Sequence, residues 1–241
     1  MARFGRGQHF RPKLFRPDLG PVYFDNSSVS GYEAALSSYT FSHTVGTNAN
    51  RLLVVGVSIF ATGSVTSIDY GGAALTKIRS DDGGVYRAEL WRLIAPASGT
   101  ATITVNLSAS LTSIAGATSW WNVDQTTPVS AQNGATGTNT PASVAVTPGS
   151  SNNRVFGNLS AQTASGITDQ IRQAPHYSAS GALGTQIGSE LGIILTAVST
   201  TLQWNGIGVV DAWATSAVAL QPPQAVAVTI SPLLTLLGLG S

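Results

Sequence analysis

Hydrophobic and polar residues alternate in short segments along much of this chain, and the segments are separated by Gly, Ser, Asn and Pro. In ATITVNL, alternate apolar residues fall on one face, namely Ala101, Ile103, Val105 and Leu107. A period of two predicts a strand with one buried face. RLLVVGVSIF, which begins at Arg51, is almost continuously apolar and predicts a strand covered on both faces.

Further strands are predicted at even spacing in VTSIDY, YRAELWRLI, IAGATSWW, ASVAVT, RVFGNLS and DAWATSAVAL. Gly71 with Gly72, and Asp82 with Gly83 and Gly84, have the turn chemistry of tight hairpins. PASGT, residues 96–100, predicts a further turn. No window keeps an apolar stripe of helical period, so no long amphipathic helix is expected. The predicted fold class is all-β, an antiparallel β-sandwich of jelly-roll or immunoglobulin-like type.

The composition narrows the class of protein. Only 10% of the 241 residues are charged, against roughly 25% in an ordinary soluble domain. A neutral, hydroxyl-rich surface suits extracellular or assembled β proteins better than cytosolic enzymes. Cysteine is absent, which excludes disulfides and thiolate metal sites. The basic start is not followed by an apolar run, so no signal peptide is recognised. The apolar C-terminal stretch contains Pro232 and is too short for a membrane span, so no membrane partner is expected.

The order of several phrases resembles a widespread family of β-sandwich domains. The phrases are RLLVVGVS, VTSIDYGGAALTKI, AELWRLIAPASGTATITVNLSAS, AGATSWWNVDQTTPV and WATSAVALQPP. The family occurs in tailed-phage virion proteins and in secreted or surface proteins of bacteria, and the resemblance covers roughly Phe24 to Pro222. It implies a scaffold used for display, adhesion and assembly rather than one chemistry.

The chain is expected to divide into three segments: a basic N-terminal arm at 1–20, a β-sandwich domain at 21–222, preferred as a single domain, and an apolar C-terminal tail at 223–241. The first 17 residues hold five of the twelve basic residues and no acid, so they carry +5, and the remainder, with seven bases and eleven acids, carries −4.

Apolar and basic side chains alternate in the arm, and prolines stiffen it. Such a segment can place side chains into pockets of a neighbouring molecule, with arginine bonding to carboxylates or backbone. The expected partner-binding residues of the arm are Arg3, Phe4, Arg6, Phe10, Arg11, Lys13, Phe15 and Arg16. A solubilising tail without a partner is the alternative. Nucleic acid is a disfavoured partner, because packaging arms carry denser basic runs.

The tail is apolar enough to need a covering surface, either in its own sheet or on a neighbour's edge. Burying four or five leucines at roughly 1.5 to 3 kcal/mol each would contribute several kcal/mol to an assembly. The expected partner-binding residues of the tail are Val226, Val228, Ile230, Leu233, Leu234, Leu236 and Leu237.

No set of residues stands out as catalytic or metal-binding. His9, His43 and His176 lack the spacing of zinc ligands, and His43 is expected to be a hydrogen-bonded structural imidazole in a strand. No G-x-S-x-G nucleophile elbow or phosphate loop is present. Asp81 and Asp82 are expected in a turn rather than as a glycosidase pair. Asp81 and Asp82, with Asp69 and Asp124, could bring carboxylate oxygens together in loops, so calcium binding stays open as an alternative. No cofactor is expected.

Trp120 and Trp121 are consecutive, so on a strand one side chain must face inward and the other outward. Core packing together with an interface contact is the favoured interpretation of the pair, and glycan contact is the alternative, since an exposed tryptophan can stack on a pyranose ring or anchor a protein neighbour. Trp91, Trp204 and Trp213 lie in apolar strands and are expected in the core.

The favoured hypothesis is a non-enzymatic virion structural protein, made in the host cytoplasm, that decorates or cements the capsid of a tailed phage or otherwise lies on the particle surface. Its expected partners are the major capsid protein or neighbouring copies, so an oligomer or larger assembly is expected. One alternative is a glycan-binding module for host attachment. Another is a single-jelly-roll coat protein whose arm contacts nucleic acid. An enzyme is the least favoured class.

Overall fold

A computed structural model describes residues 19–138, 140–162, 166–208 and 211–224. All regular secondary structure among these residues is β-strand, and all strand pairs are antiparallel, so the predicted all-β, antiparallel class is confirmed. The strands before residue 122 are β1 (Tyr23–Val29), β2 (Glu33–Val45), β3 (Leu52–Ile59), β4 (Val65–Tyr70), β5 (Ala73–Ala74), β6 (Thr76–Asp82), β7 (Arg87–Ile94) and β8 (Gly99–Trp121). The later strands are β9 (Val129–Gly137), β10 (Ala142–Val146), β11 (Asn153–Ala161), β12 (Thr168–Asp169), β13 (Gln173–Gly181), β14 (Gly184–Ile194), β15 (Thr200–Asn205) and β16 (Trp213–Leu220).

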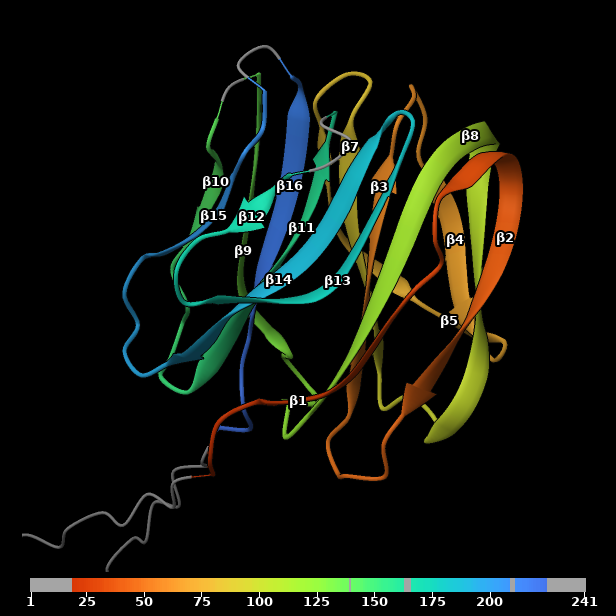
Figure 1. The fold of residues 1–241 in the computed structure, drawn as a ribbon. Coiled ribbons are helices and arrows are strands. Elements are labelled where there is room, and N and C mark those ends of the chain that lie inside the picture. The colour runs from red at the N-terminus through yellow and green to blue at the C-terminus, as the bar shows by residue number, and fades with distance from the viewer. Residues whose placement is uncertain (1–18, 139, 163–165, 209–210, 225–241) are drawn as a thin grey trace, which may run out of the picture.

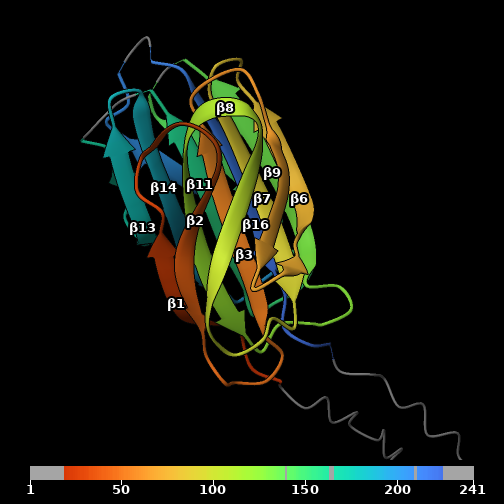
Figure 2. The same ribbon diagram turned by 90° about the vertical axis from the view of Figure 1, so that its right-hand side faces the viewer.

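The long strand β8 organises the first sheet. Its first half pairs with β2 and β4, and its second half pairs with β1 and β3. Gly99 lies opposite Val45 and Trp120 lies opposite Leu52, so both ends of β8 are near the short connection between β2 and β3. The strand therefore bends back on itself, as Figure 2 shows at one end of the molecule. The resulting eight-stranded sheet has the order β5-β4-β8-β3-β7-β6, with β1 and β2 also paired to β8.

The strands after residue 128 form two further sheets. One has five strands in the order β13-β14-β11-β16-β9, and the other has three strands in the order β10-β15-β12. The chain thus divides at the connection 122–128: the first sheet comes entirely from strands before it and the other two from strands after it.

The sheets stack as four layers (Figure 1). The first layer is β2, β4, β5 and the first half of β8, and the second is β1, β3, β6, β7 and the second half of β8. The five-stranded and three-stranded sheets are the third and fourth layers. Separate hydrophobic clusters fill the three interfaces: one around Leu53 and Ile103, a central one around Trp120 and Phe156, and one around Leu159 and Trp204.

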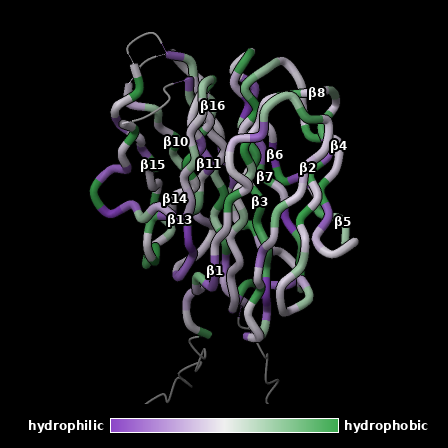
Figure 3. The backbone as a smooth tube through the Cα atoms, turned by 45° about the vertical axis from the view of Figure 1, so that its right-hand side comes forward, coloured by the Kyte–Doolittle hydropathy of each residue, from purple (hydrophilic) through white to green (hydrophobic). Residues whose placement is uncertain are grey.

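The inner strands are buried on both faces, as the continuous apolar run of β3 predicted. All of Leu52–Ile59 is buried. Leu53 and Val55 face the first layer, while Leu52 and Val54 face the five-stranded sheet. The strand β16 is also buried throughout. Figure 3 shows hydrophobic segments along the inner strands, β3 among them.

Two predicted strands turn out to be one. ATITVNL and IAGATSWW were expected as separate strands, but both belong to β8. The residues between them include the exposed Ser108, Ala109 and Ser110, and neither glycine nor proline interrupts them. The backbone therefore stays extended through the bend instead of ending in a turn. The face assigned to ATITVNL is confirmed, because Ile103, Val105 and Leu107 are buried.

The predicted glycine turns are confirmed in part. Gly71 and Gly72 connect β4 to β5 with φ values of 56° and 85°. Gly84 has a φ of 91° in the turn between β6 and β7, whereas Gly83 does not need a positive φ. No helix is present in the ranges that the structure describes.

Candidate interaction site

The first and last described segments meet at one end of the molecule. The N-terminal root, residues 19–22, is held by Asn122, whose Nδ2 donates to the carbonyl oxygens of Leu19 (2.8 Å) and Pro21 (2.9 Å). The backbone N–H of Val22 donates to the carbonyl of Asn152 at 3.2 Å. This root is therefore bonded to residues from both halves of the chain.

The C-terminal root, residues 221–224, is bonded to the same connection. The N–H of Asp124 donates to the carbonyl of Gln221 (2.9 Å), and the N–H of Gln221 donates to the carbonyl of Pro128 (3.0 Å). The side-chain amide of Gln221 donates to the carbonyl of Thr127 at 2.5 Å. We call the end formed by residues 19–22, 122–128 and 221–224 the terminal pole; in Figure 1 the chain before β1 and the chain after β16 both reach it.

Asp124 stabilises the loop of the terminal pole. Its Oδ1 accepts the backbone N–H groups of Thr126 (2.8 Å) and Thr127 (2.7 Å). Burial alone would raise the pKa of Asp124, but backbone hydrogen bonds from Thr127, Thr126 and Gln224 together bring it below the ordinary value. The ionised carboxylate therefore links the connection 122–128 to the last described residue.

A cluster that we call the clasp, formed by Phe24, Arg154, His176 and Glu190, fixes β1 against the five-stranded sheet. The ring of Phe24 stacks on the His176 ring, with centroids 4.0 Å apart and planes at 20°. The Arg154 guanidinium donates to the carbonyl of Val22 (3.0 Å) and to Glu190 Oε1 (2.9 Å). β1 pairs with β8 by its backbone, so the strand that follows the arm is bonded to two layers at once.

A β-bulge places His176 in the clasp. Pro175 pairs with Ser189 and Tyr177 pairs with Gly188, so His176 is the extra residue on β13. The bulge allows the consecutive side chains of His176 and Tyr177 both to face the first sheet, where His176 also meets Trp120 edge-on at 5.4 Å. His176 Nε2 lies 3.7 Å from Glu190 Oε1. His176 Nε2 and Glu190 Oε2 are buried without a hydrogen-bond partner.

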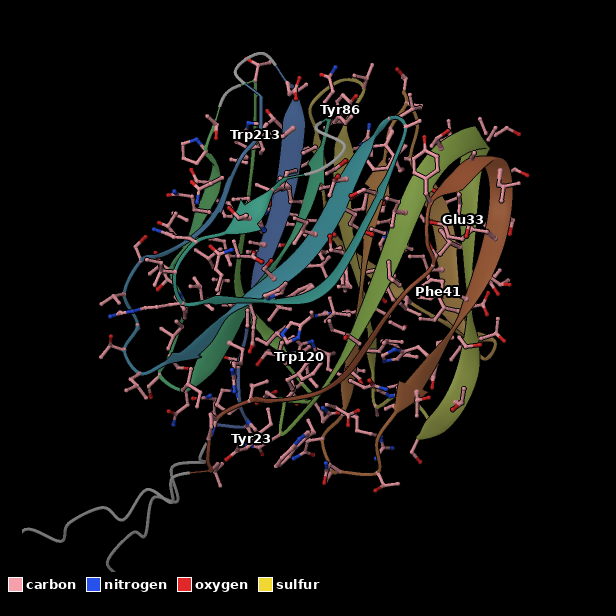
Figure 4. All side chains as sticks on the ribbon, in the orientation of Figure 1. Tyr23, Glu33, Phe41, Tyr86, Trp120 and Trp213 are labelled. Carbon is pink, nitrogen blue, oxygen red and sulfur yellow. The ribbon has the colours of Figure 1, made fainter. Side chains whose placement is uncertain are left out.

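The two predicted contact tryptophans have different environments. Trp120 is fully buried and meets Phe24 and Phe156 edge-on, so the expectation that it contacts a glycan or a neighbour is corrected. Figure 4 shows Trp120 between the layers and Tyr23 close to the terminal pole. Trp121 is partly exposed and stacks on Tyr23, with centroids 4.1 Å apart and planes at 13°. The predicted alternation of inward and outward side chains is thus confirmed, and only Trp121 of the pair is available at the surface.

The residues predicted to bind partners in the arm and the tail lie outside the described residues. They are Arg3, Phe4, Arg6, Phe10, Arg11, Lys13, Phe15 and Arg16 in the arm, and Val226, Val228, Ile230, Leu233, Leu234, Leu236 and Leu237 in the tail. What the structure gives is the position of the two roots from which these segments extend, and both roots are at the terminal pole.

Two carboxylates that could suggest chemistry have structural partners. Glu89 is fully buried and accepts from Trp91 Nε1 at 3.0 Å, and Lys77 Nζ lies 3.0 Å from the same oxygen. Asp81, which was expected in a turn, lies instead in β6, where it pairs with Arg79 and accepts the hydroxyl of Ser216 in the five-stranded sheet. The bulky side chain fits because Gly134 leaves space beside it.

Two further aspartates accept hydrogen bonds from nearby backbone. Asp82 accepts the N–H of Gly84 (2.9 Å), as expected of a turn, and Asp69 accepts the N–H of Gly72 (3.2 Å). Within the described ranges, no group of three or more His, Cys, Asp or Glu residues is arranged to hold a metal ion. The four aspartates named as possible calcium ligands do not form such a group.

Comparisons with protein-family models, with curated proteins and with solved structures found no match for this chain. In the part of the chain that the structure describes, no helix is long and apolar enough to cross a membrane.

Sequence reasoning missed the clasp. Its members come from β1, β11, β13 and β14, and the strands β13 and β14 were not predicted. These two strands are rich in Gly and Ser, so the alternation of large apolar residues that marks the other strands is weak in them. The one available signal was His176 beside an aromatic residue in an otherwise small-residue stretch.

Proposed function

We propose that this protein is a non-enzymatic structural component on the surface of a tailed-phage particle, attached through its terminal segments. The observation that carries the proposal is the position of both roots at one pole of a sandwich, where each is bonded to the connection 122–128. A contact made by either segment would therefore act on the same end of the molecule.

The clasp gives the N-terminal arm a firm base. Force or binding at the arm is transmitted to β1, which is bonded to the first sheet through β8 and to the five-stranded sheet through His176 and Arg154. Glu89 and Asp81, two carboxylates that could suggest chemistry, both have structural partners. A structural domain with a firmly bonded arm root is consistent with a capsid decoration or cement protein.

The sequence resemblance to β-sandwich domains of phage virion proteins supports the same proposal, with a jelly-roll or immunoglobulin-like relationship as its finer form. The proposed partners are the major capsid protein or neighbouring copies of this chain. The proposed location is the particle surface, after synthesis in the host cytoplasm.

Deletion of residues 1–17 tests the proposal. The shortened chain should keep the far-ultraviolet circular dichroism of a β protein and a cooperative unfolding transition, because the first residue that a clasp side chain contacts is Val22. It should lose occupancy on particles from which the native protein has been removed. Full occupancy of the shortened chain would contradict the proposal.

Two matched variants separate the contributions of charge and apolar contact. One replaces the five basic residues of the arm with glutamine, and the other replaces Phe4, Phe10 and Phe15 with alanine. A protein contact through pockets predicts a loss of occupancy in both. Binding that depends only on the basic residues and falls steeply with salt would point to nucleic acid instead.

Glycan binding is a second candidate because of the partly exposed Trp121 and its stacked neighbour Tyr23 at the terminal pole. A glycan array probed with the wild-type chain and with Trp121→Ala tests this candidate. A signal that the substitution abolishes would favour host attachment, and an array without signal would remove the candidate.

A further inference from the structure

An exposed apolar surface lies at the end of β14. We call Ile193, Leu195 and Val198 the apolar loop; their exposed fractions are 41%, 71% and 55%. The loop has defined local structure, because the N–H of Val198 donates to the carbonyl of Thr196 (2.8 Å) and the Thr200 hydroxyl donates to the carbonyl of Val198 (3.2 Å). Figure 1 shows the connection between β14 and β15 at the left edge of the molecule. Apolar side chains gathered in this way favour a covering surface.

The register of the five-stranded sheet places this loop close to the C-terminal root. Ile193 lies opposite Arg154 on β11, and Arg154 lies opposite Leu220 on β16. Neighbouring strands are about 4.8 Å apart, so Ile193 and Leu220 are separated by about 10 Å. Gln221 follows Leu220 directly, and the chain leaves the sandwich from this point.

The segment that follows the root has matching chemistry. Residues 225–241, AVAVTISPLLTLLGLGS, contain no charged side chain and five leucines. The tail begins four residues after Leu220, and residues 221–224 are bonded to the connection 122–128. An extended chain spans at most about 3.5 Å per residue, so Gln224 lies at most about 24 Å from Ile193, and about seven residues suffice to cross that distance. About ten residues then remain to cover the apolar loop.

We propose that residues 225–241 pack against the apolar loop of their own chain. The short link to Gln224 gives the segment an effective concentration in the millimolar range at this surface, which favours the same chain over a second copy. The particle contact is then made by the N-terminal arm, and the tail shields apolar surface in the free protein. The packing itself does not rest on the proposed function, but it narrows the attachment proposed there to the N-terminal arm.

Cysteine cross-linking tests the packing directly, because the natural chain contains no cysteine. The test pair is Val198→Cys with Leu234→Cys. The control pair is Val85→Cys with Leu234→Cys; Val85 is 52% exposed and lies next to Tyr86, which Figure 4 shows at the opposite end of the molecule. A disulfide within one chain is expected for the test pair under mild oxidation, at a rate at least tenfold higher than for the control pair.

The mass of the cross-linked product shows whether the apolar loop is covered by the tail of its own chain or by the tail of a second copy. Cross-linked monomers support the proposal. Cross-linked dimers would assign the apolar loop to the tail of a second copy, and equal rates in the two pairs would mean that the tail packs elsewhere; either result overturns the proposal.

A second measurement guards against effects of the substitutions on folding. The chain that ends at Gln224 should bind a synthetic peptide of residues 225–241 in a titration. Leu195→Ser should weaken this binding at least tenfold, because a leucine contact is removed, and Val85→Ser should leave it unchanged. Absence of peptide binding would contradict the proposal. It would not affect the arm deletion experiment, which measures attachment to the particle.

Discussion

His43 shows at the scale of one residue how this fold uses a titratable group in its structure. The ring is 1% exposed on β2, and its Nδ1 lies 2.9 Å from the hydroxyl of Ser28. Burial lowers the pKa of His43 from 6.5 to about 4, although the nearby Asp25 carboxylate acts in the opposite direction. The prediction of a hydrogen-bonded structural imidazole in a strand is therefore confirmed.

The stability of the protein should consequently fall as the pH is lowered from about 6.5 to about 4. In this window the unfolded chain binds a proton at His43 that the folded chain excludes, so the free energy of unfolding loses about 3 kcal/mol. Denaturant unfolding at a series of pH values measures the loss. His43→Gln should remove this part of the pH dependence. An unchanged pH dependence in the variant would show that other groups cause it.

The core positions of single residues were well predicted where the local pattern was strong. Trp91, Trp204 and Trp213 are buried, as expected from apolar strands. The partners of the clasp were out of reach, because 36 residues separate Arg154 from Glu190 and the contact depends on the order of strands in the sheet. The pattern of apolar residues along the chain indicates which residues are buried, but it does not indicate the order of the strands in a sheet.

At the scale of the element, β1 is bonded to two sheets by different forces. Its backbone pairs with β8, while the stack of Phe24 on His176 and the bond from Ser27 Oγ to the His176 carbonyl (2.7 Å) hold it to β13. Such a strand should open only when both sets of contacts are lost. The firm position of the arm root follows from this double attachment.

Phe24→Ala should therefore free β1 without unfolding the remaining strands. We expect a loss of about 1 to 3 kcal/mol in the free energy of unfolding, since Phe24 is only partly buried. Amide hydrogen exchange in 22–29 should accelerate more than exchange in β3.

Phe41→Ala is the matched control, because Phe41 is a partly buried residue that packs on the first hydrophobic cluster rather than on the clasp. It should not selectively accelerate exchange in β1. Equal acceleration by the two substitutions would contradict the role assigned to the clasp.

Strong strands were predicted from the sequence, but their connections were not. The continuous apolar run of β3 indicated burial on both faces correctly. The single bent strand β8 was missed because a bend made of Ser and Ala resembles a loop. The Gly- and Ser-rich strands β13 and β14 were missed because glycines such as Gly188 leave room for a large ring, that of Tyr177, instead of marking a strand by their own side chains.

At the scale of the whole molecule, the central interface decides whether the two halves of the chain behave as one unit. It combines aromatic packing with polar bonds between the sheets: Asn158 Nδ2 donates to the carbonyl of Val57 at 3.3 Å, and Gln186 Nε2 donates to the carbonyl of Gly56 at 2.9 Å. Gly116 of β8 and Gly188 of β14 allow the Tyr177 ring to lie between the sheets. The two halves of the chain are therefore held together by the close approach of their sheets as well as by the burial of hydrophobic surface.

Gly116→Ala should weaken the central interface, so that the two halves of the chain unfold separately. A Cβ atom at this position would lie 2.3 Å from Tyr177 Cε2, so the ring or the sheets must shift, at a cost of about 1 to 3 kcal/mol. Calorimetry should show a lower melting temperature and a broadened or divided transition, against a single transition in the wild type. Gly192→Ala is the control, since no atom lies within 4 Å of its Cβ position. Equal melting temperatures for the two variants would contradict this view of the interface.

The common position of the two roots has a practical consequence for engineering. A reporter protein joined at residue 19 or at residue 224 would lie beside Asn122 and Asp124, close to the other root. The turn between β6 and β7, with Gly84 at a φ of 91°, is next to Tyr86, which Figure 4 shows at the end opposite Tyr23, and is the better graft point for a foreign epitope. A peptide inserted there would lie away from the terminal pole.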